Sequence, residues 1–413
     1  MNARAAAAYS YILRPPVALF LLAFFIRLAY ILFVSRGELS PDSYDWMATG
    51  WQIAQGQGFG GSWRPPGYAF FLGGMFFIFG KSVIAVLIAQ ALLGAGTCVL
   101  AYKTAATILN TATGRITGTL AAFYPYFIAY SADVLSETLL TFLLAAAVFF
   151  IVRTSREPGW KNMAASGLLI GLTALTKSTT LPFFLLACAW LWWQTGKFKT
   201  GFIVGTFTLL AIAPWTLRNY YHYDQGYVMP VSTPWYTLYC ASCDEALYAE
   251  MRGETDVPSD KNARSLIDPP DLEYISSLPV PERDKLCREK ALTWIKGNPD
   301  KFLTLVRLRF VHFWRLYPMM AYKWQKYAAM ATSGLYIPLC LIGIFLSIRE
   351  FKKTSLLLAL FVSYTAVHLF FFSMIRYRVP IDTFIIMFAA HTLERAYTAL
   401  TRSRAHARMA GTR

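Results

Sequence analysis

A small number of charged side chains stand out in this sequence because their types suit group-transfer chemistry. Glu38, Asp42 and Asp45 fall within eight residues, directly after the first long apolar run. Asp133 and Glu137 are four residues apart, a spacing that places both on one face of a helix. A carboxylate can act as a general base that removes a proton from a hydroxyl group. Lysine and arginine suit a phosphate, and arginine can bind it bidentately.

The elements that must position these side chains are membrane-spanning helices. Of the 413 residues, 56% are hydrophobic and 15% are charged, against about 25% charged in a soluble domain. A helix needs about 20 mostly apolar residues to cross the hydrocarbon layer, and the apolar runs lack the alternation of a lipid-facing barrel. We expect the first run to be a retained span, because no small-residue cleavage pattern follows it. The ten expected spans are residues 15–35, 83–105, 116–131, 137–153, 162–178, 179–195, 200–216, 327–348, 354–374 and 379–398.

The basic residues predict how these spans are oriented. Lysine and arginine cluster at the ends of apolar runs, and a cytoplasmic N-terminus places every cluster between spans on the cytoplasmic side. The net charge of +16 is therefore assigned to cytoplasmic loops, and we expect no nucleic acid as a partner. Both termini are expected in the cytoplasm, with the chain in a bacterial inner membrane.

Several segments are expected on the outer side of the membrane. Residues 66–80 are apolar but too short to cross, so we expect an interfacial or re-entrant helix there. Residues 298–318 predict an amphipathic helix that lies on the membrane. The chain then divides into an N-terminal transmembrane module (1–218) with a catalytic first outer loop (36–82), a small extracytoplasmic loop domain (219–326), and C-terminal transmembrane helices with a basic cytoplasmic tail (327–413).

The cysteines give little further constraint. Cys240, Cys243 and Cys287 lie in the outer segment, where a disulfide from Cys287 to either of the others, or one within the CASC stretch, is open. A zinc site would need a fourth ligand, which no nearby histidine supplies at motif spacing.

This topology brings acids and bases to the outer ends of the spans. Opposite charges from separate helices would there form a polar pocket at the membrane boundary. A lipid phosphate would suit it, because that group departs as a stable anion and needs no general acid. The residues favour transfer of a group from a lipid phosphate to an alcohol, with snorkelling anchors or structural ion pairs as the alternative. The acids are Glu38, Asp42, Asp45, Asp133, Glu137 and Asp382, and the bases are Lys177, Arg218, Arg376 and Arg378.

The order of several motifs resembles the membrane GT-C glycosyltransferases, in the branch that includes protein O-mannosyltransferases and lipid A aminoarabinose transferases. The matching stretches are PDSYDWMATGWQIAQGQGF, RPPGYAFFLGGMFFIFG, SADVLSETLLTFLL, GLTALTKSTTLPFFLL, PWTLRNY and RYRVPID, within residues 15–220 and 330–395. The resemblance implies an all-α integral membrane protein, a GT-C-like bundle with interfacial helices in the first outer loop and a small extracytoplasmic domain.

The resemblance also implies roles for single residues. Asp42 takes the place of the catalytic base, although Ser43 stands where many members carry a second acid. The other acids, Asp45, Asp133 and Glu137, would position the acceptor or support the site. The donor phosphate would be bound by Lys177, Arg218, Arg376 and Arg378, with Arg64 and Tyr68 as pocket walls. A divalent metal, Mg or Mn, is left open, with Glu137 as its ligand.

The function implied is inverting transfer of a hexose or pentose. The donor would be a polyprenyl-phosphate sugar, and the acceptor a hydroxyl group of a lipid, glycan or protein on the periplasmic side, with membrane lipids around the enzyme. Two alternatives stay open: a polysaccharide polymerase or ligase that uses a lipid-linked oligosaccharide, and a transporter or flippase for a lipid headgroup.

Overall fold

The computed structural model describes residues 15–35, 37, 39–60, 64–223, 231–232, 234–253, 271–317 and 323–410, without the side chains of residues 272, 324, 325, 328 and 404–410. Glu38 lies outside these residues. The described chain is helical throughout and has no strand. This agrees with the expected all-α class.

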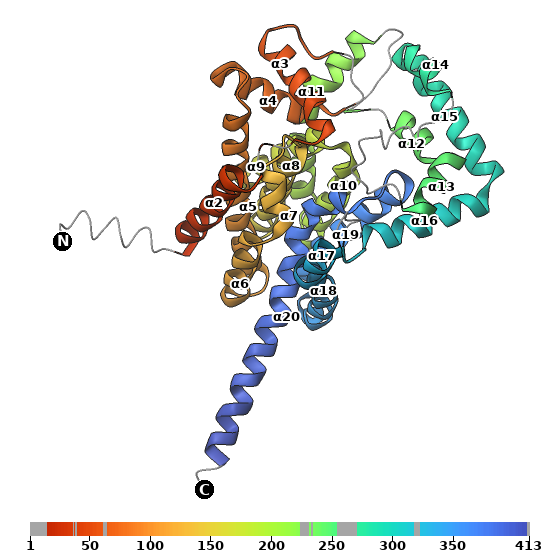
Figure 1. The fold of residues 1–413 in the computed structure, drawn as a ribbon. Coiled ribbons are helices and arrows are strands. Elements are labelled where there is room, and N and C mark those ends of the chain that lie inside the picture. Colours follow the sequence, from red (N-terminus) through yellow and green to blue (C-terminus); the bar gives the residue numbers. More distant parts are fainter. Residues whose placement is uncertain are drawn as a thin grey trace.

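The long apolar runs form the helices of a bundle (Figure 1). Five helical stretches are long and apolar enough to cross a membrane: α2 (Pro15–Phe33), α5 (Val83–Ile108), α8 (Ser136–Arg156), α11 (Phe198–His222), and Ile348–Phe370, which includes α19 (Phe351–Phe370). The other expected spans are also helical. They are α6 (Thr111–Ala122) with α7 (Pro125–Ser131), α9 (Trp160–Thr176), α10 (Leu181–Thr195), α18 (Leu335–Leu346) and α20 (Ile375–Ala410). The total of ten spans stays a prediction.

Local sequence explains where several helices begin and end. The break between α6 and α7 falls just before Pro125, which has no backbone N–H and therefore suits the first turn of a new helix. Ser82 caps α5 by accepting a hydrogen bond from the backbone N–H of Ala85, and Asn110 caps α6 in the same way through Thr113. Gly196 ends α10 in the left-handed conformation that glycine adopts readily.

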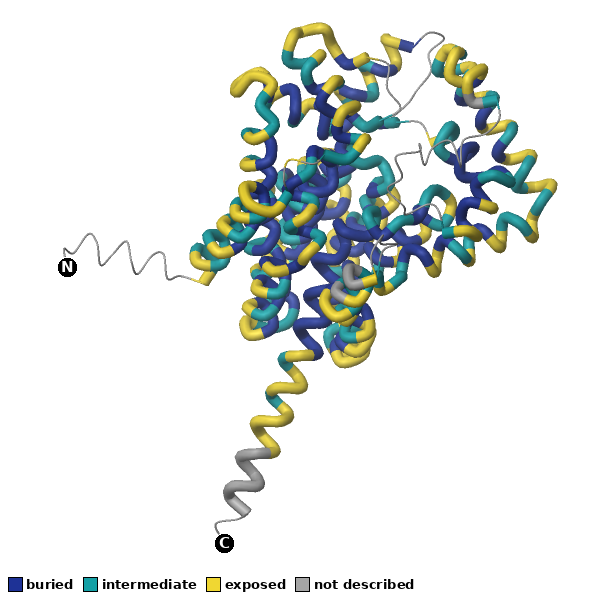
Figure 2. Tube along the Cα trace, viewed as in Figure 1, coloured by how far each residue is buried: buried dark blue, intermediate teal, exposed yellow. Residues whose placement is uncertain are grey.

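Small residues let the bundle helices approach closely. A Cβ atom on Gly167 of α9 would collide with the carbonyl oxygen of Val204 in α11, and one on Gly343 of α18 would collide with that of Phe388 in α20. The buried residues of the bundle lie at its centre and include the first half of α20, while residues 393–403 of α20 extend beyond the bundle and are largely exposed (Figure 2). This close packing is typical of membrane helices, whose association depends on van der Waals contact.

Arg27, in the middle of α2, is fully buried, and its position has a structural reason. Its guanidinium donates hydrogen bonds to the carbonyl of Ala23 at 2.9 Å and to those of Ala122 and Ala121 at 3.4 and 3.5 Å. Ala121 and Ala122 lie in the last turn of α6, whose carbonyls lack partners within the helix. Arg27 therefore caps the C-terminal end of α6 by donating to its last carbonyl oxygens.

Two crossing helices follow α2 on one side of the bundle, α3 (Pro41–Ala54) and α4 (Pro66–Phe79) (Figure 1). Residues 66–80 thus form the expected short helix, and its place in the membrane interface stays a prediction. Beyond α11 lie α12 (Trp235–Ala241), α13 (Asp244–Arg252), α14 (Leu272–Ser277), α15 (Val280–Gly297) and α16 (Pro299–Phe313). Before α18 lie α17 (Lys323–Ala329) and the π-helical turn η4 (Met330–Gly334).

Helices α12 to α16 have a small core of their own, and Arg309 is one of their anchors to the bundle. Leu238, Tyr239, Ile275 and Cys287 pack together between α12, α14 and α15. Arg309 of α16 is fully buried and donates hydrogen bonds to the carbonyls of Leu369 and Phe370, at the end of α19. None of the six cysteines is in a disulfide, so the disulfides that the sequence left open do not form in this structure.

Candidate active site

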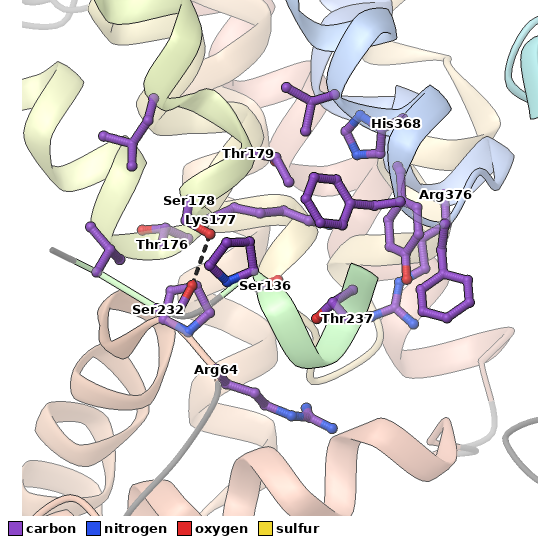
Figure 3. A pocket seen from close by; sticks show the side chains of 18 of the residues that line it. Arg64, Ser136, Thr176, Lys177, Ser178, Thr179, Ser232, Thr237, His368 and Arg376 are labelled. Atoms are coloured by element: carbon purple, nitrogen blue, oxygen red, sulfur yellow. Dashed lines mark hydrogen bonds between the residues drawn. The ribbon is translucent and has the colours of Figure 1, made fainter. Parts of the chain in front are cut away.

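A cavity of about 780 Å³ lies where the ends of several helices meet (Figure 3). Its wall comes from the start of α3, the loop before α4, the start of α8, the connection from α9 to α10, the segment around α12, the end of α19 and the start of α20. Segments far apart in the sequence therefore build one site. The predicted residues Asp42, Arg64, Glu137, Lys177 and Arg376 all line it.

Arg376 joins two of the predicted acids. Its Nε atom donates to Oε1 of Glu137 at 2.7 Å, and its Nη2 atom donates to Oε2 of the same carboxylate at 3.3 Å. Its Nη1 atom donates to Oδ2 of Asp42 at 2.8 Å. The Glu137 side chain is 1% exposed and that of Asp42 is 42% exposed. Asp42 can therefore contact a substrate in the cavity, while the buried Glu137 holds the Arg376 guanidinium in place.

Lys177 stands next to the same acid, in a stretch of the cavity wall that also carries hydroxyl residues. Its Nζ atom lies 3.7 Å from Oε1 of Glu137 and 4.1 Å from the centre of the Tyr377 ring. It ends α9, and Ser178 and Thr179 follow it along the cavity wall. The Ser178 hydroxyl is hydrogen-bonded to that of Ser232 at 2.9 Å, as Figure 3 shows. An ammonium group in a cavity that also offers hydroxyl groups suits an anionic oxygen of a phosphate.

Arg64 closes the other side of Asp42. It donates to Oδ1 of Asp42 at 3.4 Å and to Oδ2 of Asp45 at 3.2 Å. Its guanidinium lies 4.7 Å from the centre of the Trp46 ring, within cation–π range. Asp45 is 64% exposed and is absent from the described cavity wall, so it contacts the site through Arg64.

Asp133 and Tyr68 are not among the described lining residues of the cavity, and they stabilise the backbone next to it. Oδ1 of Asp133 accepts a hydrogen bond from the Ser43 hydroxyl at 2.6 Å and one from the Ser40 backbone N–H at 3.2 Å. Tyr68 is fully buried and donates to Gln90 at 2.8 Å, and Gln90 donates to the Asp133 carbonyl at 2.7 Å. These bonds fix the start of α3, and therefore the backbone that carries Asp42.

The structure does not bring Arg218 and Arg378 to the cavity, and neither is among its described lining residues. Arg218 donates to the Phe59 carbonyl at 2.9 Å and lies 5.0 Å from the centre of the Trp215 ring. It thereby holds the chain after α3 against α11. Arg378 is 1% exposed and pairs with Asp382 at 3.0 Å.

Arg378 and Asp382 belong to a buried polar cluster in the bundle. Arg378 also donates to the carbonyls of Phe313 and Arg315, at 2.9 and 2.8 Å, while Asp382 accepts a hydrogen bond from the Tyr124 hydroxyl at 2.6 Å. A buried ion pair with these additional hydrogen bonds is a structural connection between α20, α16 and the start of α7.

The remaining wall of the cavity is apolar and faces the ends of α10 and α19. It consists of Leu181, Pro182, Val367, Phe371, Phe372 and Met374. Close to it, Leu185 of α10 and Phe370 of α19 are 66% and 50% exposed on the surface of the bundle. An apolar chain can therefore be accommodated beside the charged groups.

The comparisons with known proteins agree with this architecture. Residues 63–217 match a family model described as dolichyl-phosphate-mannose-protein mannosyltransferase. The fold is similar to that of the archaeal oligosaccharyltransferase AglB from Archaeoglobus fulgidus in complex with an inhibitory peptide and a dolichol-phosphate. That match has a TM-score of 0.58 and 13% sequence identity, and covers 94% of this chain and 51% of AglB. The chain has the GT-C fold.

Two further structures belong to the same set of matches. The apo form of the Archaeoglobus fulgidus oligosaccharyltransferase gives a TM-score of 0.57 and 14% identity, over 96% of this chain and 52% of that one. ArnT from Cupriavidus metallidurans, bound to undecaprenyl phosphate, gives a TM-score of 0.39 and 13% identity, over 95% and 79%. The chain spans about half the length of the oligosaccharyltransferases that it matches. No curated protein sequence matches it significantly.

The GT-C fold raises the question of a metal, and the carboxylates that the structure describes around the cavity do not fit one. The described residues contain no group of three histidine, cysteine or acidic side chains placed to hold an ion. Both oxygens of Glu137 accept hydrogen bonds from Arg376, and Lys177 stands beside one of them. Hard divalent cations such as Mg²⁺ take most of their ligands from oxygen atoms. Here the Glu137 oxygens are already engaged by the Arg376 and Lys177 side chains.

Within this GT-C fold, several lining residues were absent from the sequence predictions. Trp46 and Tyr377 are aromatic, and Ser136, Thr176, Thr179 and Thr237 carry hydroxyl groups. His368 also lines the cavity although it lies in an apolar run. The sequence offered one usable signal for it, because a histidine near the outer end of an expected span is a rare polar group on the same side as Arg376.

Proposed function

We propose that this chain is a membrane glycosyltransferase that moves a sugar from a polyprenyl-phosphate donor to a hydroxyl group on an acceptor. The observation that carries the proposal is the convergence of Asp42, Glu137, Lys177 and Arg376 in one cavity that also has an apolar wall. The family match over residues 63–217 supports the same class of reaction. The donor would be a hexose or pentose carrier, and the acceptor a lipid, glycan or protein.

The donor binds with its prenyl chain along the apolar wall and its phosphate beside Lys177. Lys177 offers an ammonium group, and Ser178 and Thr179, which follow it in the sequence, line the same cavity with hydroxyl groups. All three guanidinium nitrogens of Arg376 already donate hydrogen bonds to Glu137 or Asp42. We therefore assign Arg376 mainly to holding these two carboxylates, with its positive charge acting on the phosphate at longer range. Arg218 and Arg378 have the positioning roles described above.

The transfer step requires one base and no acid. The acceptor hydroxyl gives its proton to Asp42 while its oxygen forms a bond to the anomeric carbon of the sugar. The bond from that carbon to the phosphate oxygen breaks on the opposite side, and its electron pair leaves with the prenyl phosphate. The configuration at the anomeric carbon is therefore inverted. No step is assigned to a metal ion.

The site would face the periplasm of a bacterial inner membrane, with both chain termini in the cytoplasm. The support for this orientation is that basic clusters between apolar runs fall on the side opposite the cavity. Residues 219–326 would then form the extracytoplasmic domain. Its helix α12 contributes Tyr236 and Thr237 to the cavity wall, where an acceptor would be recognised.

The catalytic assignment is tested by replacing Asp42 with asparagine, which keeps the shape of the side chain and removes its basicity. We expect Asp42→Asn to lose sugar transfer by at least about a thousandfold, at the upper range for a general base. The matched control is Glu157→Gln, an exposed carboxylate at the far end of α8. Transfer from a radiolabelled prenyl-phosphate sugar in proteoliposomes is the measurement, and full activity of Asp42→Asn would refute the assignment.

A further inference from the structure

His368 lines the cavity, and the mechanism above gives it no task. It lies near the end of α19 and is 2% exposed (Figure 3). A buried imidazole in a wall of aromatic and aliphatic side chains has to satisfy two ring nitrogens. The partners of those nitrogens therefore decide what the ring can offer to an occupant.

One ring nitrogen is fixed by the helix itself. Nδ1 of His368 lies 2.7 Å from the carbonyl oxygen of Tyr364, one turn earlier in α19. A carbonyl oxygen only accepts hydrogen bonds, so Nδ1 carries the proton and donates it. Nε2 is then the nitrogen left for an occupant of the cavity, and in the neutral ring it presents a lone pair.

The ring is also held in one orientation. Phe313 stacks on it with the ring centres 5.4 Å apart, and Tyr364 and Tyr377 contact it at 4.7 and 5.5 Å. Tyr377 carries Lys177 over its ring at 4.1 Å, so His368 and Lys177 contact the same aromatic side chain. Burial of the ring disfavours its charged form, and the positive charge of Lys177 disfavours it further, so the imidazole is neutral.

A neutral nitrogen lone pair selects its partner by chemistry. It repels the oxygens of a phosphodiester, which have no hydrogen to donate, and it accepts from a hydroxyl group. The acceptor hydroxyl is already assigned to Asp42. The hydroxyl groups of the transferred sugar remain, and they would lie beside the phosphate at Lys177.

We propose that His368 accepts, through Nε2, a hydrogen bond from one hydroxyl group of the transferred sugar and thereby takes part in the choice of sugar. The inference rests on the proposed glycosyl transfer and adds a residue that recognises the donor. His368 is therefore a specificity residue, distinct from the base Asp42.

The test combines variants with a series of donors. Wild-type protein in proteoliposomes is given polyprenyl-phosphate mannose, or the hexose or pentose carrier that it uses best, together with each monodeoxy form of that sugar. The loss of one hydrogen bond to a neutral group should lower kcat/KM about tenfold for one of these deoxy donors. In His368→Phe, which keeps a stacked ring and removes the lone pair, the same deoxy donor should lose less than about twofold relative to the parent sugar, because no hydrogen bond remains to be lost.

Two further variants separate recognition from packing. His368→Asn can still donate to the Tyr364 carbonyl but has no atom at the place of Nε2, so it should lose the discrimination as His368→Phe does. Tyr364→Phe leaves that carbonyl and the ring contact in place, and it should discriminate among donors as the wild type does.

The outcomes distinguish the two proposals. If the wild type transfers sugar but His368→Phe and His368→Asn keep its full pattern of penalties with the deoxy donors, the role of His368 is refuted and the glycosyl transfer stands. If the wild type transfers sugar from no prenyl-phosphate donor, the proposed function is refuted, and the inference that depends on it is refuted too.

Discussion

The substitution Glu137→Gln tests whether the buried carboxylate holds the site together. Glu137 is 1% exposed, accepts two hydrogen bonds from Arg376 and lies 3.7 Å from the Lys177 ammonium. Glutamine has almost the same shape but no charge, so it leaves two neighbouring cations without their shared anion. Removing one partner of a buried ion pair costs about 3–5 kcal/mol. Because Arg376 and Lys177 are 23% and 18% exposed, we expect a loss of about 2–3 kcal/mol in the free energy of unfolding, at or below the lower end of that range.

The measurement is unfolding in mixed micelles titrated with a denaturing detergent. The control is Glu157→Gln at the other end of α8. The Glu157 side chain is 68% exposed and pairs with Arg153, so this substitution should change the free energy of unfolding by less than about 0.5 kcal/mol. The double variant Glu137→Gln with Arg376→Gln removes both charges and should recover part of the lost stability, while sugar transfer stays impaired. A Glu137→Gln protein as stable as the wild type would refute the supporting role assigned to this carboxylate.

Three further predictions concern the phosphate site, metals and the outer thiols. Lys177→Met should lower kcat/KM for the prenyl-phosphate donor about a hundredfold, as the loss of a charge-assisted contact of roughly 3 kcal/mol implies, whereas Arg218→Met should change it much less; equal effects of the two would contradict the phosphate assignment. Incubation with EDTA should leave sugar transfer intact, because the oxygens of Glu137 are bound by Arg376 rather than available to a cation; a loss restored by added Mg²⁺ or Mn²⁺ would overturn this. Burial, with a smaller contribution from Asp284, raises the pKa of Cys287 to about 11, so its thiolate is scarce at pH 8, and alkylation measured by mass spectrometry should be slow in the folded protein and fast after denaturation; rapid labelling of the folded protein would contradict the buried position.

The fold could be predicted from the sequence because apolar length and the distribution of basic residues are strong signals. Every expected span is helical, and the bundle has the expected GT-C architecture. What the sequence lacked was the exact break points. Pro125 marks the interruption between α6 and α7, yet the expected span at residues 116–131 runs through it. The burial of Arg27 depends in part on carbonyls of α6 that lie 94 and 95 residues away in the sequence.

The candidate site could be predicted in part for a related reason. The predicted orientation of the spans indicated which residues share one side of the membrane, and the structure brings four of them, Asp42, Glu137, Lys177 and Arg376, together. The orientation of a span in the membrane does not give the rotation of its helix about its own axis. Arg218 therefore points to the Phe59 carbonyl, and Arg378, two residues after Arg376 on α20, points into the bundle toward Asp382. His368 escaped notice because a single histidine in an apolar run is also compatible with simple packing.

In the proposed reaction, the sugar leaves a prenyl phosphate in this cavity and is joined to a hydroxyl group. The most direct measurement follows both products when purified protein in proteoliposomes receives a radiolabelled prenyl-phosphate sugar and a membrane extract containing acceptors. We predict that label appears in the acceptor while one prenyl phosphate is released for each sugar transferred. Label that crosses the bilayer still attached to its lipid, with no prenyl phosphate released, would refute the proposed function and indicate a transporter.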